Sequence, residues 1–240
     1  MPDRRAEVDE DGYAGDEDFV LYAAIVLWKR LMAERWSVEM IDDSIQKGYE
    51  YIKQNNYKDG LERWTDAWTM IRGIVPSYIT SVEEADEYLP EPLTQSTCNW
   101  SQDFGMELGN GGGDDISFYY HYLRIRYCSE FCAIFPDSDE LILHNMSRAE
   151  AESYASLGYI MHVADNPFDE LVEKYPDNVR GYVGWGDIYL YHARDSEDPS
   201  DYEHAEERYR WGLSRCDTEA DVIRDRLEWL EKERTGQGAT

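Results

Sequence analysis

Apolar residues recur at helical spacings of three and four along most of this chain, and few alternating runs typical of strands interrupt them. Gly, Pro and capping residues divide the apolar stretches into segments of ordinary helix length. The pattern therefore predicts an all-α protein. We expect helices over residues 17–34, 38–55, 58–73, 97–108, 115–134, 139–157, 167–174, 180–193, 202–214 and 218–233.

Several of these segments begin after a residue that can cap a helix. Ser37 precedes the second helix, and either Asp217 or Thr218 precedes the last one. Residues 74–96 form a linker in which Ser81-Val-Glu-Glu84 has the spacing of a capping box, so we expect a short helix there.

The domain organisation follows from the same pattern. Residues 17–234 are expected to form a single helical domain, long enough for a substantial core. Residues 1–16 are polar and acidic and are expected to be disordered, and residues 235–240 are expected to form a flexible tail.

Small and aromatic residues repeat in a fixed order in three parts of the chain. In the last predicted helix pair, Trp185, Gly186 and Tyr189 are followed by Ala205 and Tyr209. A small residue at such a position lets two antiparallel helices cross closely, while large neighbours fill the groove beside it. The related positions elsewhere are Gly48, Tyr51, Gly60, Trp64 and Ala67 in the first pair, and Ala151, Tyr154 and Gly158 in a middle one.

This order resembles the tetratricopeptide repeat family, whose unit is a helix–turn–helix of about 34 residues. Residues 149–187 are similar, more specifically, to the helical-repeat region of SEC-C motif-containing proteins, and the similarity covers roughly residues 41–213. That group ends in a Cys-rich metal-binding tail, whereas this chain ends in Thr235-Gly-Gln-Gly-Ala-Thr240. Zinc binding is therefore not carried over.

The resemblance implies an α–α superhelix of antiparallel helix pairs with capping helices at both ends. The first helix of each pair would line a concave surface that binds a peptide or a partner helix. The residues expected to face this surface are Tyr49, Lys53, Asn145, Arg148, Glu152, Arg180, Asp187 and Tyr191. Arg148, Asn145 and Arg180 are the best candidates for holding a carboxylate of the partner, because arginine offers a bidentate fork.

Two functions follow as hypotheses. The first is a non-catalytic scaffold for protein–protein or peptide binding through this concave surface. The alternative is a regulatory or sensory domain that binds a small ligand between the repeats and the linker at residues 74–96.

The chain carries 51 acidic and 23 basic residues, a formal net charge of −28. Such a field repels nucleic acid and anionic membranes, so neither is expected as a partner. The acids are either a surface that recruits a basic partner or a solvated surface suited to high salt or solubility. Their spread along the whole chain favours the second interpretation. A mimic of nucleic acid would need acids clustered on one face, so it ranks last.

The apolar run from Phe19 to Trp28 has ten residues and is too short to span a bilayer. Acidic residues precede it, unlike the basic start of a signal peptide. We expect a buried helix packed on the first repeat. The four cysteines form no Cys-x-x-Cys pair, so we expect reduced, mostly buried thiols and a cytoplasmic location.

No residue pattern indicates an enzyme, a metal site or a cofactor. The glycine run at residues 109–113 follows no strand and precedes two aspartates, so it is expected to be a turn rather than a phosphate loop. Five histidines are scattered singly, although His192 and His204 flank the polar stretch at residues 194–201 and could approach each other. Adjacent carboxylates point away from each other on a helix, and no Ser, Cys or Thr has a nucleophile's context.

Overall fold

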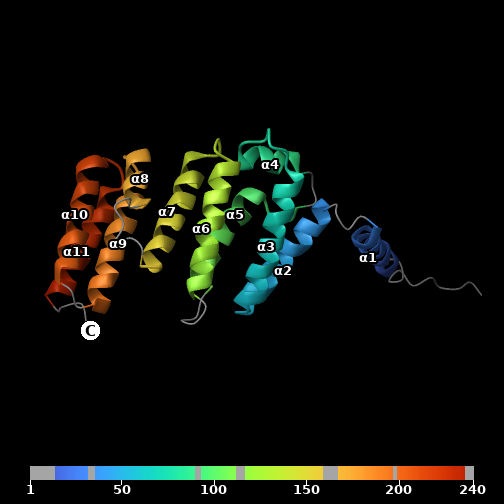
Figure 1. Ribbon diagram of the computed structural model, residues 1–240, viewed down its shortest axis with the longest axis horizontal. Coiled ribbons are helices and arrows are strands. Elements are labelled where there is room, and N and C mark those ends of the chain that lie inside the picture. The colour runs from blue at the N-terminus through green and yellow to red at the C-terminus, as the bar shows by residue number, and fades with distance from the viewer. Residues whose placement is uncertain are drawn as a thin grey trace, which may run out of the picture. The chain divides into compact units, whose positions relative to one another are not determined.

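The computed structural model describes residues 14–31, 36–89, 93–111, 117–158, 167–196 and 199–235, and every regular element within these ranges is a helix (Figure 1). The prediction of an all-α fold is confirmed for this part of the chain. The helices are α1 (Ala14–Leu31), α2 (Val38–Lys53), α3 (Tyr57–Ile74), α4 (Val82–Tyr88), α5 (Thr97–Asn110), α6 (Ser117–Ile134), α7 (Glu140–Ser156), α8 (Pro167–Lys174), α9 (Val179–Ser196), α10 (Pro199–Arg215) and α11 (Ala220–Arg234).

The chain forms two compact units. One comprises residues 1–76 and 87–96, and the other comprises residues 77–86 and 97–240. Of the tails predicted at residues 1–16 and 235–240, residues 1–13 and 236–240 lie outside the described ranges. Within the described ranges, no helix combines the length and apolar character that a membrane span requires.

The first unit contains an antiparallel hairpin of α2 and α3. Ser37 caps α2 as predicted, since its hydroxyl accepts a hydrogen bond from the Met40 backbone. The pair crosses closely at Gly48, where a Cβ atom would lie 2.1 Å from Nε1 of Trp64. Trp64 is fully buried, and its Nε1 donates to the carbonyl of Ile45 at 3.0 Å. The small–aromatic pairing expected from the sequence is therefore present in this hairpin.

The expectation that α1 is a buried helix is wrong. Phe19 is 69% exposed and Leu31 is 76% exposed, and Val20, Tyr22 and Leu27 are exposed as well. The apolar run predicted helix formation correctly, but hydrophobicity alone does not supply a neighbour to pack against.

In the second unit, side chains of residues 81–86 cap the starts of both α4 and α5. The Ser81 hydroxyl accepts from the Glu84 backbone at 3.1 Å, and the Glu84 carboxylate accepts from the Thr80 backbone at 3.3 Å. The capping box predicted here is therefore present in slightly shifted form. Asp86 of α4 in turn accepts from the first backbone N–H groups of α5, at Thr97 and Cys98.

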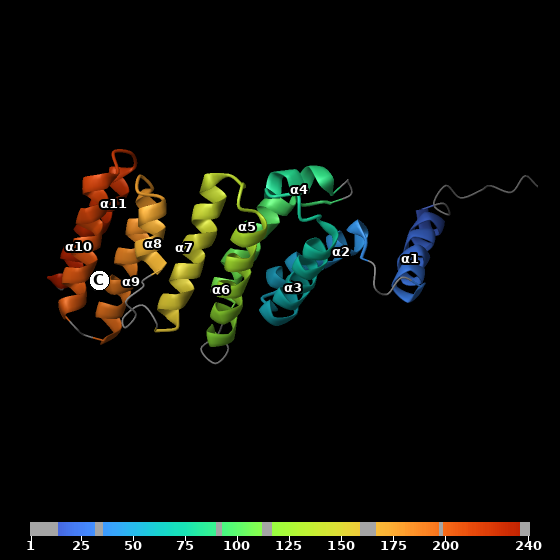
Figure 2. The same ribbon diagram turned by 45° about the horizontal axis from the view of Figure 1, so that its top comes forward.

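Helices α6 and α7, and helices α9 and α10, lie side by side in this unit (Figures 1 and 2). A Cβ atom at Gly186 would lie 2.3 Å from Cε1 of Tyr209, so α9 and α10 cross where the sequence predicted. Trp185 and Phe168 stack with their ring centres 6.2 Å apart and carry this packing to α8. A superhelical course of these pairs stays a prediction.

Two local expectations at the C-terminal end were wrong. The polar turn expected at residues 194–201 is largely helical, because α9 continues to Ser196 and α10 begins at Pro199. Proline suits a first helical position, where its missing N–H would have no partner inside the helix. Neither Asp217 nor Thr218 caps α11. The N-cap is Glu219, which adopts a left-handed conformation with φ 54° and makes no side-chain cap.

The close crossing of α9 and α10 can be tested by Gly186→Leu. The new side chain would overlap Tyr209, so we expect the free energy of unfolding to fall by roughly 1–3 kcal/mol through overpacking. Gly105→Ala is the matched control, because a Cβ atom there meets its nearest neighbour at an ordinary 3.6 Å. Chemical denaturation measures both variants. An unchanged midpoint for Gly186→Leu would show that this crossing is not close.

Candidate functional site

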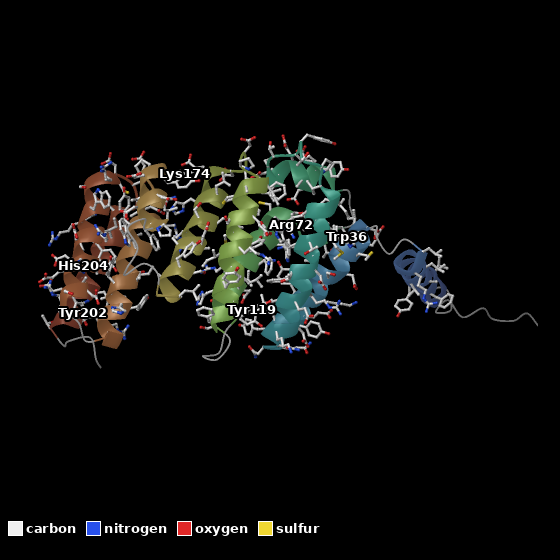
Figure 3. All side chains as sticks on the ribbon, in the orientation of Figure 1. Trp36, Arg72, Tyr119, Lys174, Tyr202 and His204 are labelled. Carbon is white, nitrogen blue, oxygen red and sulfur yellow. The ribbon has the colours of Figure 1, made fainter. Side chains whose placement is uncertain are left out.

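A cleft of about 660 Å³ opens in the second unit among the start of α7, the turn from α8 to α9, and the turn from α10 to α11. It brings together two of the predicted binding residues, Asn145 of α7 and Arg180 of α9. Lys174 at the end of α8 (Figure 3) and Glu219 before α11 also line it. These side chains come from three separate stretches of the sequence, and we take the cleft as the candidate functional site.

The wall of the cleft between α8 and α9 is fixed by hydrogen bonds. The carbonyl of Pro176 accepts from the Tyr182 hydroxyl at 3.1 Å and from the Cys216 thiol at 3.6 Å. The Asn178 side chain accepts from the Arg180 backbone at 3.1 Å and so closes the first turn of α9. Arg180 therefore projects from a well-defined backbone position.

The cations of the cleft are held only weakly by their neighbours. The Arg180 guanidinium lies 3.9 Å from the Glu219 carboxylate, and both side chains are more than half exposed. Ion pairs of this kind contribute little to stability because water screens them. The Lys174 ammonium lies 5.1 Å above the ring of Tyr175. Both groups can therefore turn towards a bound anion without a large loss of existing interactions.

Asn145 is positioned by its amide group, which donates to the Gln102 side chain at 3.3 Å. This contact joins α7 to α5 and holds the Asn145 side chain at the cleft. The exposed Leu141, one turn earlier on α7, adds an apolar surface to the same wall.

His144 lies behind this wall and is fully buried. Its ring meets that of Tyr175 edge-on, with centres 5.3 Å apart. Neither ring nitrogen has a hydrogen-bond partner of normal geometry among the described residues, although the neighbouring Asn145 amide slightly favours the charged ring. Burial, helped by the charge of Arg148, lowers the pKa of His144 to about 4. The ring is therefore neutral at physiological pH.

Arg148 and Glu152 lie in the same helix but are engaged with each other. Glu152 pairs with Arg148 one turn before it, and it also accepts from the Arg124 guanidinium at 3.2 Å. Arg124 in turn donates to the Gly105 carbonyl at 2.7 Å. These contacts tie α5, α6 and α7 together. The structure thus gives Arg148 and Glu152 partners within the protein, in addition to the binding role predicted for them.

Asp187 and Tyr191 lie on α9, away from the cleft lining. The half-buried Asp187 carboxylate accepts from the Tyr209 hydroxyl at 2.6 Å and pairs with Arg226 at 3.0 Å. Burial raises the pKa of Asp187, and the two partners oppose this rise. Tyr191 is exposed and meets Trp229 of α11 edge-on.

The two remaining predicted residues belong to the first unit. Tyr49 packs edge-on against Trp64, with ring centres 4.8 Å apart, and Lys53 is exposed in the last turn of α2. Of the eight predicted residues, the cleft therefore gathers Asn145 and Arg180.

Lys174 and Glu219 were not among the predicted residues. Lys174 is the last residue of the helix predicted over residues 167–174 and is followed by Tyr175-Pro176. Binding residues are often found in the turns after helices. The position of Lys174 at a helix end was therefore the one feature of the sequence that could have indicated it. No feature of the sequence indicated Glu219 as a cleft residue.

His192 and His204 approach each other as the sequence suggested, because both contact Asp201. The Nδ1 atom of His192 lies 2.6 Å from one carboxylate oxygen of Asp201, and that of His204 lies 3.8 Å from the other. Figure 3 shows His204 on α10. In the part of the chain that the structure describes, no group of three or more His, Cys, Asp or Glu residues is arranged to hold a metal ion.

Comparisons with family models, with curated proteins and with solved structures find no match for this chain. The resemblance to tetratricopeptide repeats therefore stays a prediction that rests on the residue pattern.

The neutral state of His144 predicts an acid-sensitive fold. Its pKa is about 6.5 in an unfolded chain and about 4 in the fold, so the unfolded chain binds more protons in between. This contribution to stability is fully present above about pH 6.5 and is lost as the pH falls towards 4. We expect His144→Leu to flatten the pH dependence of the unfolding free energy in this window. Denaturation curves measured at a series of pH values check this, and an unchanged slope would contradict it.

Glu150 of α7 predicts the opposite slope. Burial, with a smaller contribution from Glu170, raises the pKa of Glu150 from 4.5 to about 7. The folded state therefore binds more protons than the unfolded chain between these values, and stability falls as the pH rises from about 4.5 to 7. Glu150→Gln should remove this fall and give a more stable protein at pH 8. A melting temperature at pH 8 below that of the parent would refute this expectation.

Proposed function

We propose that this protein is a non-catalytic, tetratricopeptide-like scaffold that binds a peptide segment of a partner protein in the cleft beside Asn145, Lys174 and Arg180. The observation that carries the proposal is that Asn145 of α7 meets Lys174 and Arg180, which flank the turn from α8 to α9, in one cleft of about 660 Å³. Two cations and an amide donor suit a carboxylate of the partner.

The chemistry of the cleft further restricts the partner. Glu140, Asp177 and Glu219 line it together with the two cations, so a bound peptide should carry a basic group near its carboxylate. The exposed Leu141 offers a contact for one apolar side chain. The preferred ligand is therefore a short mixed-charge segment with an acidic and a basic residue.

Binding rather than catalysis is proposed because the cleft offers donors for recognition. The cysteines are the strongest nucleophiles of the chain, but burial raises the pKa of the thiols of Cys98, Cys128, Cys132 and Cys216, which disfavours the reactive thiolate. These thiols are unpaired, and this supports our proposal of a reducing, cytoplasmic location.

The helix pairs support the repeat assignment within this proposal. Gly48 with Trp64, and Gly186 with Tyr209, place a small residue against an aromatic ring at a helix crossing in each unit. The acidic surface supports a protein partner over nucleic acid or an anionic membrane, because both of these need basic residues that neutralise phosphate.

A small acidic metabolite is the second candidate ligand, because the volume of the cleft lies within the range of small-molecule sites. This candidate keeps the regulatory role considered from the sequence. Its site is now the cleft at α7, α8 and α9 instead of the linker at residues 74–96.

Charge reversal in the cleft tests the proposal. Peptides that bind the parent protein can be selected from a displayed random library. We expect these peptides to bind the Arg180→Glu and Lys174→Glu variants at least about tenfold more weakly than the parent. This factor corresponds to the loss of one charge-assisted hydrogen bond. Arg224→Glu is the matched control, because Arg224 is exposed on α11 outside the cleft and the change in net charge is identical. Arg148→Glu is less suitable, because Arg148 already pairs with Glu152.

A second set of measurements identifies the group that is bound. Replacing the acidic residue of a selected peptide by its amide should weaken binding to the parent but not to Arg180→Glu. Selected peptides that bind all variants equally would exclude the cleft as the binding site. If no peptide is selected, but a metabolite raises the melting temperature of the protein in a saturable manner, the small-ligand function is favoured over the scaffold.

A further inference from the structure

One residue of the cleft, Glu219, has a backbone conformation that its residue type does not favour. Its φ of 54° and ψ of 23° place it in the left-handed region, where a Cβ atom raises the free energy. The other described residues with positive φ are Asn55 and Gly158, and asparagine and glycine adopt this conformation most readily. Glutamate has no such preference, so the turn before α11 carries a residue that costs stability.

Glu219 makes no compensating contact with the helix that follows it. It is the N-cap residue of α11, but its side chain accepts no capping hydrogen bond. Its carbonyl accepts from the Val222 backbone at 3.1 Å, which a residue of any type could do. Asp, Asn, Ser and Thr are preferred at an N-cap because their side chains bind the free N–H groups of the first turn. The local structure therefore does not explain a glutamate at this position.

The side chain of Glu219 lies beside Arg180 in the cleft. Its carboxylate is 3.9 Å from the guanidinium, and 54% of the Glu219 side chain and 58% of the Arg180 side chain are exposed. This separation exceeds that of a hydrogen bond, and an exposed ion pair of this kind is weak. Glu219 therefore places a carboxylate, weakly held, at the cation that would bind the carboxylate of a ligand.

The other acids of the cleft are placed differently. Glu140 and Asp177 line it as well, but among the described residues Glu219 is the one lining acid that pairs with a lining cation. Glu140 and Asp177 can attract a basic group of a ligand, but they do not compete with its carboxylate for Arg180. The competing position belongs to Glu219.

We propose that Glu219 sets the charge specificity of the cleft by exchanging partners when a ligand binds; this inference rests on the proposed function. Before binding, Glu219 pairs with Arg180. The carboxylate of the ligand then takes its place at Arg180, and the released Glu219 pairs with a basic group of the ligand. A ligand with an acid alone separates Glu219 from Arg180 without giving Glu219 a new partner. The cleft therefore discriminates against such a ligand.

Two peptides test the exchange by isothermal titration calorimetry. The first is a selected peptide that carries an acid and a base, and the second is the same peptide with its base replaced by norleucine. The parent protein should bind the first peptide more tightly. Glu219→Gln should bind the second peptide about two- to fivefold more tightly than the parent does, a factor that corresponds to one exposed ion pair. It should also lose the preference for the first peptide.

Three further variants complete the test. Asp217→Asn removes the same charge from an exposed residue of this turn that does not line the cleft, and it should bind both peptides like the parent. In an Arg180→Gln background, Glu219→Gln should no longer tighten binding of the second peptide, because no ion pair is left to break. Glu219→Gly should raise the melting temperature, since glycine accepts the left-handed conformation.

Several results would overturn the exchange while leaving the proposed function intact. These are selected peptides that lack a base, a Glu219→Gln variant that keeps the preference for the first peptide, and one that binds the second peptide no more tightly than the parent does. A melting temperature of Glu219→Gly at or below that of the parent would also overturn it, because glutamate would then cost nothing at this position. If the selected peptides bind independently of Arg180 and Lys174, the proposed function fails and the exchange fails with it.

Discussion

The close approach of helices at small residues is the interaction on which the rest of the described structure depends. At Gly48 and at Gly186 the absent side chain leaves room for an aromatic ring of the next helix. Each ring is buried, and its polar atom has a partner: Trp64 donates to the Ile45 carbonyl, and Tyr209 donates to the Asp187 carboxylate. One contact thus buries a large apolar area and orients a hydrogen bond, which fixes both the distance and the register of two helices.

The excess of acidic residues imposes a second constraint. Several carboxylates that the packing encloses have an arginine beside them, because a charge removed from water needs a partner. Arg124 pairs with Glu152, and Arg226 pairs with Asp187. Arg208 instead lies over the ring of Trp185, with 4.1 Å between its guanidinium carbon and the ring centre. Two enclosed acids have other surroundings, since Asp201 lies beside His192 and His204, and burial raises the pKa of Glu150.

The cleft is a product of the same packing. Tyr175 is buried against the His144 ring, and the Lys174 ammonium lies above the Tyr175 ring, so one aromatic side chain contacts both the core and the cleft. The carbonyl of Pro176 is held by two donors. Because the wall is held by structural contacts, its backbone at Arg180 and the Asn145 amide are positioned before any ligand arrives, and less entropy is lost in ordering them.

The sequence by itself determined the helices and their closest crossings, because both depend on neighbours that are near in the chain. The periodic apolar residues, the Ser37 cap, the start of α8 at Pro167 and the small residues Gly48 and Gly186 all act within one helix or one hairpin. The repeat pattern also indicated Asn145 and Arg180, since each position in a repeat faces a fixed side.

Only the tertiary structure decided which of the predicted residues meet and which are engaged elsewhere. It gave Glu152 two arginine partners from different helices, and it joined Lys174 and Glu219 to the cleft across long stretches of sequence. It also left α1 exposed, although its composition suited a buried helix. The physical reason is the same in each case. Burial, ion pairing and cleft formation depend on distances between segments remote in sequence, and no local pattern of residue types specifies those distances.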